Sequence, residues 1–486
     1  MSVPVISVAQ MREWEQATWD AGITEKGVIA QVGKKLGFWL QTTALSAHGF
    51  VIVAGKGNNG EDARQSLPFF ESHSLPAPLV VNVKDPVTDF AELDRALSEH
   101  RDCAIVDALF GIGLNRTLSE DWIRVIERLN DSRSEVYSVD CPSGLDSDTG
   151  RTMGAAIRAT RTLTLGAPKR GLLTPQAIEY VGRLETESDI GLVECPFEDS
   201  LNWTEGKDFE DFPPRRSIAS HKGSHGHLAI VAGSSGYHGA AVLAAEGAFN
   251  AMPGLVSVFA HEPCYIPVAS QLKAAMVHPW TEGIDFPDKA TAILVGPGLA
   301  NEQLPESVRG FVRKLWAESP VTVIADASAL DWLPEGKTPE GAIRLMTPHP
   351  GEAARMLGTD SKEIQADRAS TLKRLSEKYG NCFVVLKGHQ TLVGNSIGPV
   401  YINSTGNPLL AQGGSGDVLA GFLAGLLAQP ILTQDALRTI RYAIWAHGMA
   451  ADHAAASDAP LFIGQLPKLI RGDFGDDSSL WSLLES

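Results

Sequence analysis

The feature that most constrains the fold is an alternation of short β-rich runs with longer mixed segments, which occurs twice along the chain. The intervening segments include DWIRVIERLN (121–130), whose apolar residues recur at helical spacing. Continuous apolar strands with helices between them are typical of parallel sheets covered on both faces. The predicted strands lie at 50–55, 78–83, 103–110, 135–140 and 162–167, and then at 226–234, 255–260, 292–298, 321–327, 344–349 and 382–388. The sequence therefore predicts an α/β fold in each half.

A change of composition separates the two series of strands. The stretch PFEDSLNWTEGKDFEDFPPRRSIAS is polar and acidic and carries a proline pair, as linkers do. A chain of 486 residues also exceeds what one ordinary hydrophobic core holds. We therefore expect a first domain over 1–200, a linker over 201–220 and a second domain over 221–486.

Charge and cysteine content limit the partners and the compartment. The formal net charge of −17 argues against nucleic acid or an anionic membrane as the main partner. Five scattered cysteines without a CxxC pair indicate reduced thiols rather than a disulfide framework or a zinc site. The N-terminus lacks the sections of a signal peptide, and the apolar run VLAGFLAGLLA (418–428) is too short to span a bilayer. We expect a cytoplasmic protein that forms a homo-oligomer, with Gly421 and Gly425 allowing close helix packing.

The stretch AQGGSGDVLAGFLAGLL (411–427) places one carboxylate between a glycine-rich turn and an apolar run of helical period. Asp417 there is open to two interpretations. In the first interpretation, Asp417 is the N-cap of the helix, since aspartate is a favoured cap after such a turn. Alternatively, the first-turn N–H groups and the helix dipole bind a phosphate, and the acid takes a proton from the hydroxyl that attacks it.

Three polar motifs of the first half follow predicted strands: GKGNNGEDA (55–63), DALFGIGLNRT (107–117) and VDCPSGLD (139–146). Each motif alone is an ordinary turn. Together they bring oxygen-bearing side chains to one edge of the sheet, because the carboxyl ends of parallel strands meet there. Such oxygens suit a hard cation, and the GIG turn offers amides to a phosphate. The side chains concerned are Asn58, Asn59, Asp107, Asp140 and Ser143.

These motifs resemble the NAD(P)HX epimerase domain, whose pattern runs roughly GNNGGDG, DALLGTG and SVDIPSGLDADTG. The resemblance covers about residues 1–200 and implies a Rossmann-like parallel-sheet domain. It also implies that K⁺ is held by Asn59, Asp107 and Ser143, and that Asp140 lies beside the reacting carbon as a catalytic residue. The implied substrate loops are Asn58, Asn59, Gly60, Glu61 and Asp62, and then Gly111, Ile112, Gly113, Leu114, Asn115, Arg116 and Thr117.

This chain departs from that pattern in the first loop. Glu61 and Ala63 replace two glycines, and Pro68 interrupts the helix expected next. We expect Glu61 to repel a doubly phosphorylated ligand and Ala63 to resist a positive φ. Two interpretations therefore stand for this domain, an active epimerase and a catalytically degenerate module for binding or assembly.

The motifs of the second half, in order, are HKGSHGHLAIVAGSSGYHGAA (221–241), VGPGL (295–299), TPHPGEAARML (347–357), KGHQTLV (387–393) and GNPLLAQGGSGDVLAG (406–421). The series resembles the ADP/ATP-dependent NAD(P)HX dehydratase, a member of the ribokinase-like α/β fold. The resemblance implies that the nucleotide contacts Lys387, Gly388, His389, Gln390, Thr391 and Gly416. It implies that the hydrated dinucleotide contacts Ala240, Gly298, His349 and Asp417.

The implied chemistry favours the base over the cap for Asp417. Hydroxide is a poor leaving group, so the C6 hydroxyl of the substrate is first phosphorylated, and phosphate then departs. Asp417 accepts the hydroxyl proton, and Mg²⁺ accompanies the ADP. ADP against ATP stays open, as does a small-alcohol kinase of the same fold. His349 is alternatively a plain turn residue, and the alternating histidines His221, His225 and His227 indicate structural or loop roles rather than a metal cluster.

Overall fold

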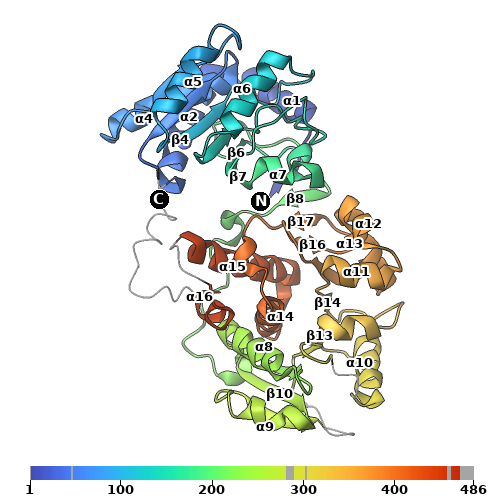
Figure 1. The fold of residues 1–486 in the computed structure, drawn as a ribbon. Helices are drawn as coiled ribbons and strands as arrows, with labels where there is room; N and C mark the ends of the chain where they lie inside the picture. The colour runs from blue at the N-terminus through green and yellow to red at the C-terminus, as the bar shows by residue number, and fades with distance from the viewer. Residues whose placement is uncertain (1, 45–46, 281–288, 301–303, 457–460, 471–486) are drawn as a thin grey trace. The chain divides into compact units, whose positions relative to one another are not determined.

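The computed structural model describes residues 2–44, 47–280, 289–300, 304–456 and 461–470 (Figure 1). The chain divides into two compact units, an N-terminal unit of Val3–Asp199 and a C-terminal unit that starts at Ser200. The end of the predicted second domain, 471–486, lies outside the described residues.

The N-terminal unit is built on a parallel sheet of strand order β3-β2-β4-β5-β6-β7. All five strands predicted for this half are present. A further strand, β7, was missed because its sequence RLETE is mostly polar and buries only Leu184. The strands are β2 (Phe50–Ala54), β3 (Leu79–Asn82), β4 (Ala104–Ala108), β5 (Val136–Val139), β6 (Arg161–Leu165) and β7 (Arg183–Glu187), and a short strand β1 (Val3–Pro4) opens the unit.

Helices cover both faces of this sheet, as continuous apolar strands require. One face packs against α2 through a core that includes Leu36 and Ile52, and the other packs against α5 and α6 through a core that includes Leu93 and Ile126. The helix expected after this loop is interrupted near Pro68, since one helix ends at Arg64 and the next starts at Leu67. The helices are α1 (Val8–Asp20), α2 (Glu25–Thr43), α3 (Asn58–Arg64), α4 (Leu67–Ser72), α5 (Phe90–Glu99), α6 (Glu120–Asn130) and α7 (Ile178–Val181).

The C-terminal unit contains a larger mixed sheet, in which consecutive neighbours run β8-β17-β16-β15-β14-β13-β12-β9-β10-β11. Only β16 runs antiparallel to its neighbours among these strands. The six predicted strands of this half are all present. The strands are β8 (Leu201–Trp203), β9 (His227–Val231), β10 (Leu255–His261), β11 (Met276–Trp280), β12 (Ala292–Val295), β13 (Thr322–Ala325), β14 (Arg344–Met346), β15 (Phe383–Leu386), β16 (Leu392–Gly394) and β17 (Val400–Ile402).

Two helices of this unit, α8 and α14, touch through their backbones. A Cβ on Gly421 of α14 would lie 1.8 Å from the carbonyl oxygen of Ala244, and one on Gly247 of α8 would lie 2.2 Å from that of Val418. The expected close packing at Gly421 is therefore confirmed. The helices of the unit are α8 (His238–Ala251), α9 (Tyr265–Ala269), α10 (Glu306–Glu318), α11 (Pro350–Leu357), α12 (Ser361–Ala366), α13 (Arg368–Lys378), α14 (Ser415–Leu427), α15 (Ala436–Ala456) and α16 (Leu466–Ile470).

The segment expected as a linker, 201–220, differs from that expectation over its first part. Its residues 201–203 form β8, which pairs in parallel with β17. The aromatic ring of Phe209 then packs against Tyr442 and Trp445 of α15, and Asp208 forms a buried ion pair with Arg441. Polar composition was misleading here, because a few large side chains are enough to dock a short acidic segment.

No helix among the described residues combines the length and the apolar character needed to cross a bilayer.

Candidate functional site

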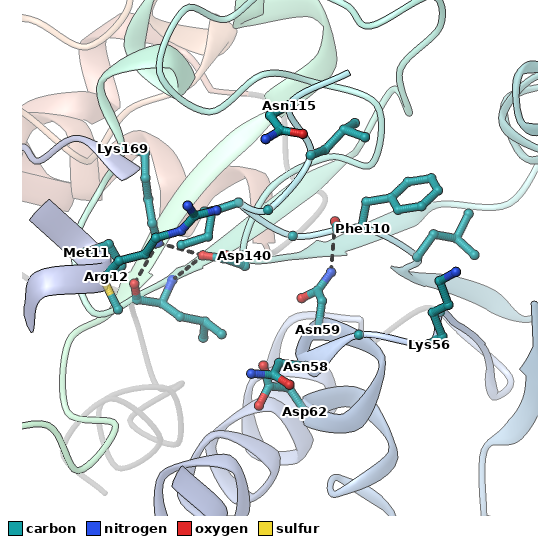
Figure 2. Close-up of a pocket in the computed structure, with 18 of the residues that line it drawn as sticks. Met11, Arg12, Lys56, Asn58, Asn59, Asp62, Phe110, Asn115, Asp140 and Lys169 are labelled. Atoms are coloured by element: carbon teal, nitrogen blue, oxygen red, sulfur yellow. Dashed lines mark hydrogen bonds and ion pairs between the residues drawn. The ribbon is translucent and has the colours of Figure 1, made fainter. Parts of the chain in front are cut away.

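A cavity of about 950 Å³ opens at the carboxyl edge of the N-terminal sheet (Figure 2). It lies beyond β2, β4, β5 and β6, where residues such as Gly55, Asp140 and Leu165 line it. The three motifs singled out in the sequence converge on this cavity. The predicted residues that line it are Asn58, Asn59, Asp62, Gly111, Ile112, Gly113, Leu114, Asn115, Arg116, Thr117 and Asp140.

Two residues of the predicted first loop do not line the cavity. Gly60 packs against the backbone, because a Cβ there would lie 2.2 Å from the carbonyl oxygen of Gly55. Glu61 is turned aside and accepts hydrogen bonds from Arg64 Nε at 2.9 Å and Gln65 Nε2 at 3.1 Å. These bonds lower the pKa of Glu61, so it stays ionised but faces its own helix. The structure therefore gives no reason to expect direct repulsion between the Glu61 carboxylate and the ligand.

The concern about Ala63 also fails. Ala63 belongs to α3, which has ordinary right-handed helical geometry, and its side chain is fully buried. The positive φ angles among the described non-glycine residues fall elsewhere, at Asp140 among others. An alanine in this position therefore costs the loop nothing in backbone strain.

Asn59, Asp107 and Ser143 meet around the backbone of Phe110. Asn59 Nδ2 donates to Phe110 O at 3.0 Å, and Phe110 N donates to Ser143 Oγ at 2.9 Å. Ser143 Oγ in turn donates to Asp107 Oδ1 at 2.6 Å. Asp107 is fully buried, and this burial raises its pKa even though hydrogen bonds from Ser143 and Ser138 oppose the change. The three residues expected to hold K⁺ thus share one network.

One atom of that network supports a cation site. Asn59 Oδ1 is buried and has no hydrogen-bond partner among the described residues. A buried amide oxygen without a donor is costly, and a cation beside it, near Phe110 O and the Asp107 carboxylate, removes that cost. Neutral oxygens with a single charge fit a weakly held monovalent ion. The residues present therefore fit K⁺.

Asp140 has an unusual backbone and an unusual partner. Its φ angle is +64°, a left-handed conformation that non-glycine residues adopt rarely. The fully buried Lys169 donates to Asp140 Oδ1 at 2.6 Å, and also to Thr164 Oγ1 at 3.1 Å and Leu165 O at 2.8 Å. Sequence reasoning missed Lys169, because a lysine just after a predicted strand, as in TLTLGAPK, is ordinarily expected to be solvent-exposed.

Asp62 lies on α3 and lines the same cavity as Asp140. Only 8% of this residue is exposed. Burial, and after it the charge of Asp140, raises the pKa of Asp62 to about 8. Glu15 of α1 also lines the cavity, and burial followed by the charge of Asp140 raises its pKa as well. Asp62 is therefore mostly protonated at neutral pH.

The first two helices contribute cavity residues that the sequence did not reveal. They include Met11, Arg12, Glu15, Trp19, Glu25, Val28 and Ile29, while Lys56 and Trp122 come from elsewhere. No motif marks the positions on the first two helices, because their side chains belong to ordinary amphipathic helices, whereas Lys56 lies in the GKGNNGEDA motif but was not singled out there. Arg12, Lys56 and Arg116 place cationic side chains around the cavity wall.

In the C-terminal unit, α14 begins at Ser415 and its N-cap is Gly414, with a φ of +96°. Asp417 is the third residue of the helix and makes no capping hydrogen bond. The N-cap interpretation of Asp417 is therefore wrong. The αL geometry at Gly414 explains this, because only glycine adopts it without cost and so the cap falls there.

A lysine and several carboxylates surround Asp417. Lys387 Nζ lies 3.0 Å from Asp326 Oδ1 and 3.9 Å from Glu352 Oε2, and it would be 3.6 Å from a Cβ on Gly416. Burial, and after it the charge of Asp326, raises the pKa of Asp417 to about 6, while Lys387 opposes the change. Asp417 is thus an ionised carboxylate near pH 7 that retains an appreciable proton affinity, as a general base requires.

The other predicted substrate contacts of this unit fall into two places. Gly298 and Ala240 are adjacent, since a Cβ on Gly298 would lie 2.9 Å from that of Ala240. His349 is the N-cap of α11, and its Nδ1 accepts from Gly351 N at 3.0 Å. Its side chain is half exposed, so the structural role of His349 leaves one ring nitrogen, Nε2, toward Glu352 and solvent.

Lys387, Gly388, His389, Gln390 and Thr391 form the turn after β15. Two residues that the sequence did not indicate hold the backbone of this site in place. Arg368 donates to the backbone of this turn, with Nη1 3.3 Å from Gln390 O, and to the end of β15, with Nη2 3.0 Å from Leu386 O. His447 Nε2 lies 3.2 Å from Ser415 O at the start of α14, and burial lowers the pKa of His447 to about 4, so the ring is neutral. The predicted nucleotide turn is thus anchored by the partly buried Arg368, and the first turn of α14 by the buried His447.

The three histidines near β9 do not assemble. His221 Nδ1 caps its own turn by accepting from Gly223 N, and His227 Nε2 lies 2.8 Å from Ser257 Oγ. No group of three or more metal-binding side chains of the His, Cys, Asp and Glu types occurs in the described part of the chain. His221 thus has a loop role, whereas His227 is a buried residue of β9 and has a structural one.

The chain thus consists of two α/β units, each with polar residues gathered beyond the carboxyl ends of parallel strands. The model of the NAD(P)H-hydrate dehydratase family matches residues 228–471, and that of the YjeF-related protein N-terminus matches residues 79–171. The bifunctional NAD(P)H-hydrate repair enzyme of Coxiella burnetii is 32% identical over 92% of this chain and 94% of its own length. The Escherichia coli enzyme of the same name is 33% identical over 84% of this chain and 81% of its own. This chain belongs to the family of bifunctional NAD(P)H-hydrate repair enzymes.

Among solved structures, an ADP/ATP-dependent NAD(P)H-hydrate dehydratase from Bacillus subtilis, co-crystallised with ATP and Mg²⁺, matches with a TM-score of 0.48. It is 31% identical and covers 53% of this chain and 91% of its own.

Proposed function

We propose that this chain repairs hydrated NADH and NADPH in two steps. The N-terminal unit interconverts the R and S epimers, and the C-terminal unit dehydrates the S epimer at the expense of ADP, giving NAD(P)H, AMP and phosphate. The observation that carries the proposal is the pairing of two separate sites, each built from its family's motifs, in one chain of that family.

The geometry around Asp417 supports phosphoryl transfer in the second step. The carboxylate accepts the proton of the substrate's C6 hydroxyl, and the N–H groups of the first turn of α14 face the transferring phosphoryl group. Lys387, which lies against that turn, supplies a positive charge to the same region. Glu352, whose carboxylate lies beside Lys387, would offer an oxygen to Mg²⁺ bound with the nucleotide, and the ion would shield the nucleotide's phosphates.

The network around Phe110 supports K⁺ binding in the first unit. In this proposal Asn59, Asp107 and Ser143 would hold the ion, whose charge would help to position the substrate beside Asp140. The cationic side chains of Arg12, Lys56 and Arg116 on the cavity wall offer charge to the pyrophosphate of the dinucleotide. K⁺ itself supplies positional charge rather than redox or acid–base chemistry.

The orientation of Glu61 favours an active epimerase over a degenerate binding module. Its ion pair with Arg64 keeps its charge on the flank of α3, and the cavity residues Asn58, Asn59 and Asp62 keep the positions that the family motif gives them. The altered residues of the loop therefore lie outside the cavity.

A mixed sample of NADHX epimers with ADP, Mg²⁺ and K⁺ tests both steps, with the return of NADH absorbance as the readout. We expect the purified chain to convert the whole sample, because the R epimer is supplied to the second site by the first. Consumption of only the S fraction would leave the binding-module interpretation for the N-terminal unit. Phosphorylation of a small alcohol at a higher rate than dehydration would instead favour the kinase interpretation of the C-terminal unit.

A further inference from the structure

Lys169 is the most deeply buried charge of the N-terminal cavity, with no exposed side-chain surface. Its ammonium group has three protons, and the structure offers three acceptors at 2.6, 3.1 and 2.8 Å, namely Asp140, Thr164 and Leu165. Taking a lysine out of water is expensive, so its complete and matched set of partners indicates a built position rather than an accident of packing.

The pairing divides the two oxygens of the Asp140 carboxylate. Oδ1 receives Lys169 and also the backbone N–H of Leu165 at 3.4 Å. Oδ2 has no donor among the described residues, and it lies 3.4 Å from the Cβ position of Gly111, on the side of the cavity. The left-handed backbone of Asp140 is what aims the side chain in this way. One oxygen is thus anchored, and the other faces the ligand space.

Asp62 approaches the cavity from a different element (Figure 2). Its carboxyl group has no hydrogen-bond partner among the described residues and is almost completely buried. The charged groups that influence it are Asp140, Glu15, Glu61 and Glu25, all of them acidic, and with burial they raise the pKa of Asp62 to about 8. Asp62 is therefore mostly protonated at neutral pH, in a cavity where Asp140 is paired with a cation.

We propose that Asp62 and Asp140 act as a proton donor and a proton acceptor on the hydrated nicotinamide ring, and that Lys169 is the residue that positions Asp140. This inference rests on the proposed epimerase function. It adds to that function a second catalytic residue, a positioning residue and a route.

The route follows from the chemistry of the reacting carbon, C6, which carries a hydroxyl group and is bonded to the ring nitrogen N1. Asp140 Oδ2 takes the hydroxyl proton, the C6–N1 bond breaks, an aldehyde forms at C6, and Asp62 gives its proton to N1. Rotation about the C5–C6 bond then presents the opposite face of the aldehyde. N1 attacks that face, its proton returns to Asp62, and the proton on Asp140 returns to the oxygen. No atom or electron is gained or lost, and no water enters.

The test uses the full chain with purified R epimer, ADP and Mg²⁺, and follows R-to-S conversion separately from dehydration of the S epimer. Asp62→Asn is expected to lower kcat for epimerisation by about 10²–10⁴-fold, the usual contribution of an acid–base group, with KM within about threefold. Asp62→Glu should restore part of the rate. The matched control is Asp94→Asn, which removes a carboxylate paired with Arg128 at the surface of the same unit and should leave the rate unchanged.

Lys169→Arg keeps the charge but not the geometry, and Lys169→Met removes both. Lys35→Met, at a half-exposed ion pair of the same unit, is the control for loss of a lysine. Wild-type kcat/KM should fall above about pH 8, where Asp62 loses its proton, and this limb should be absent from the residual activity of Asp62→Asn. Both Lys169 variants should lower kcat more than they raise KM. If Lys169→Met does not fold, as judged by near-ultraviolet circular dichroism, Lys169→Arg and the Asp62 variants carry the test.

The outcomes separate this inference from the function on which it rests. A wild-type chain that does not convert the R epimer contradicts the proposed function itself. A wild-type chain that does convert it, with Asp62→Asn and Lys169→Arg within threefold of its rate and an unchanged pH profile, overturns the inference alone. Incorporation of one ¹⁸O atom from labelled water at each inversion overturns the ring-opening route, because it requires loss of hydroxide and addition of water.

Discussion

Replacing Asp417 by asparagine is expected to stop dehydration while leaving α14 intact. The substitution removes no cap, because Gly414 holds that position and Asp417 makes no capping hydrogen bond. The structural loss is limited to the attraction between a carboxylate and the helix N-terminus, about 0.3–1 kcal/mol. The catalytic loss is that of a general base, about 10²–10⁴-fold in rate. Nucleotide affinity should change little, since most expected nucleotide contacts lie in the turn after β15 and the substitution leaves the backbone at Gly416 in place.

The pH dependence gives this prediction a magnitude that the structure fixes. Asp417 must be ionised to accept a proton, so the rate should rise with pH and level off above the pKa of about 6. At pH 5 the expected rate is about one-tenth of the plateau, because about one-tenth of such a group is ionised one unit below its pKa. A carboxyl at the ordinary value of 3.8 would still be ionised in more than about nine-tenths of the molecules at pH 5.

A phosphate group of the nucleotide also titrates near pH 6, so the limb needs an assignment. Asp326→Asn provides it. The charge of Asp326 helps to raise the pKa of Asp417, and its removal should move the limb to lower pH, whereas a limb caused by the nucleotide would stay in place. Initial rates of NADH formation from S-NADHX between pH 4.5 and 8 are the assay. An Asp417→Asn variant that keeps more than a tenth of the wild-type rate, or a limb that Asp326→Asn does not move, would refute the assignment.

Three further outcomes follow from single contacts. Asp107→Ala should slow conversion of the R epimer by about 10–100-fold and abolish its dependence on K⁺, with dehydration of the S epimer unchanged when the two epimers are followed by chromatography. Glu61→Gly should leave KM for the R epimer within about twofold even at low salt, because Glu61 pairs with Arg64 outside the cavity; a clear fall in KM would restore the repulsion first expected from the sequence. Gly421→Ala should lower the stability of the C-terminal unit by about 1–3 kcal/mol in thermal unfolding, since its Cβ would overlap Ala244 O, and an unchanged midpoint would contradict that contact.

The strand pattern was the most predictable part of the fold. Apolar runs bounded by turn residues identify buried strands well, and every strand expected from such a run is present. The strands that were missed include β7, which is polar, β8, which is short, and β11, whose sequence MVHPW contains a proline. RLETE of β7 alternates charge with a single buried leucine, and LNW of β8 lies in an acidic stretch whose composition resembles a linker. Their pairing depends on neighbours distant in sequence, which a local pattern does not contain.

The residues of the candidate sites also differ in how far the sequence could predict them. Residues in the first turn of a helix, such as Asn59 and Asp417, were identifiable because glycine-rich turns and lone carboxylates mark them. Lys169 was not, because a lysine after a strand reads as solvent-exposed until tertiary structure buries it. The direction of the Glu61 side chain was equally inaccessible, since it depends on whether Arg64 or the cavity offers the better partner. Sequence located the site, and only packing distinguished the side chains that face it.

The backbone contact between α8 and α14 has a consequence for motion. At Gly247 and Gly421, a carbonyl group of the other helix occupies the space of the missing side chain. The two helices therefore have no layer of rotatable side-chain atoms between them at these points that could adjust if they slid. Their first turns carry Ala240 and Asp417, so these two positions keep a fixed separation whatever the loops before them do. Any rearrangement of the preceding loops around a ligand therefore takes place against two helices, α8 and α14, that do not shift relative to each other. In hydrogen exchange, the amides in the middle of both helices should open together and slowly, whether or not ligand is bound, while those of the preceding glycine-rich loops respond to it.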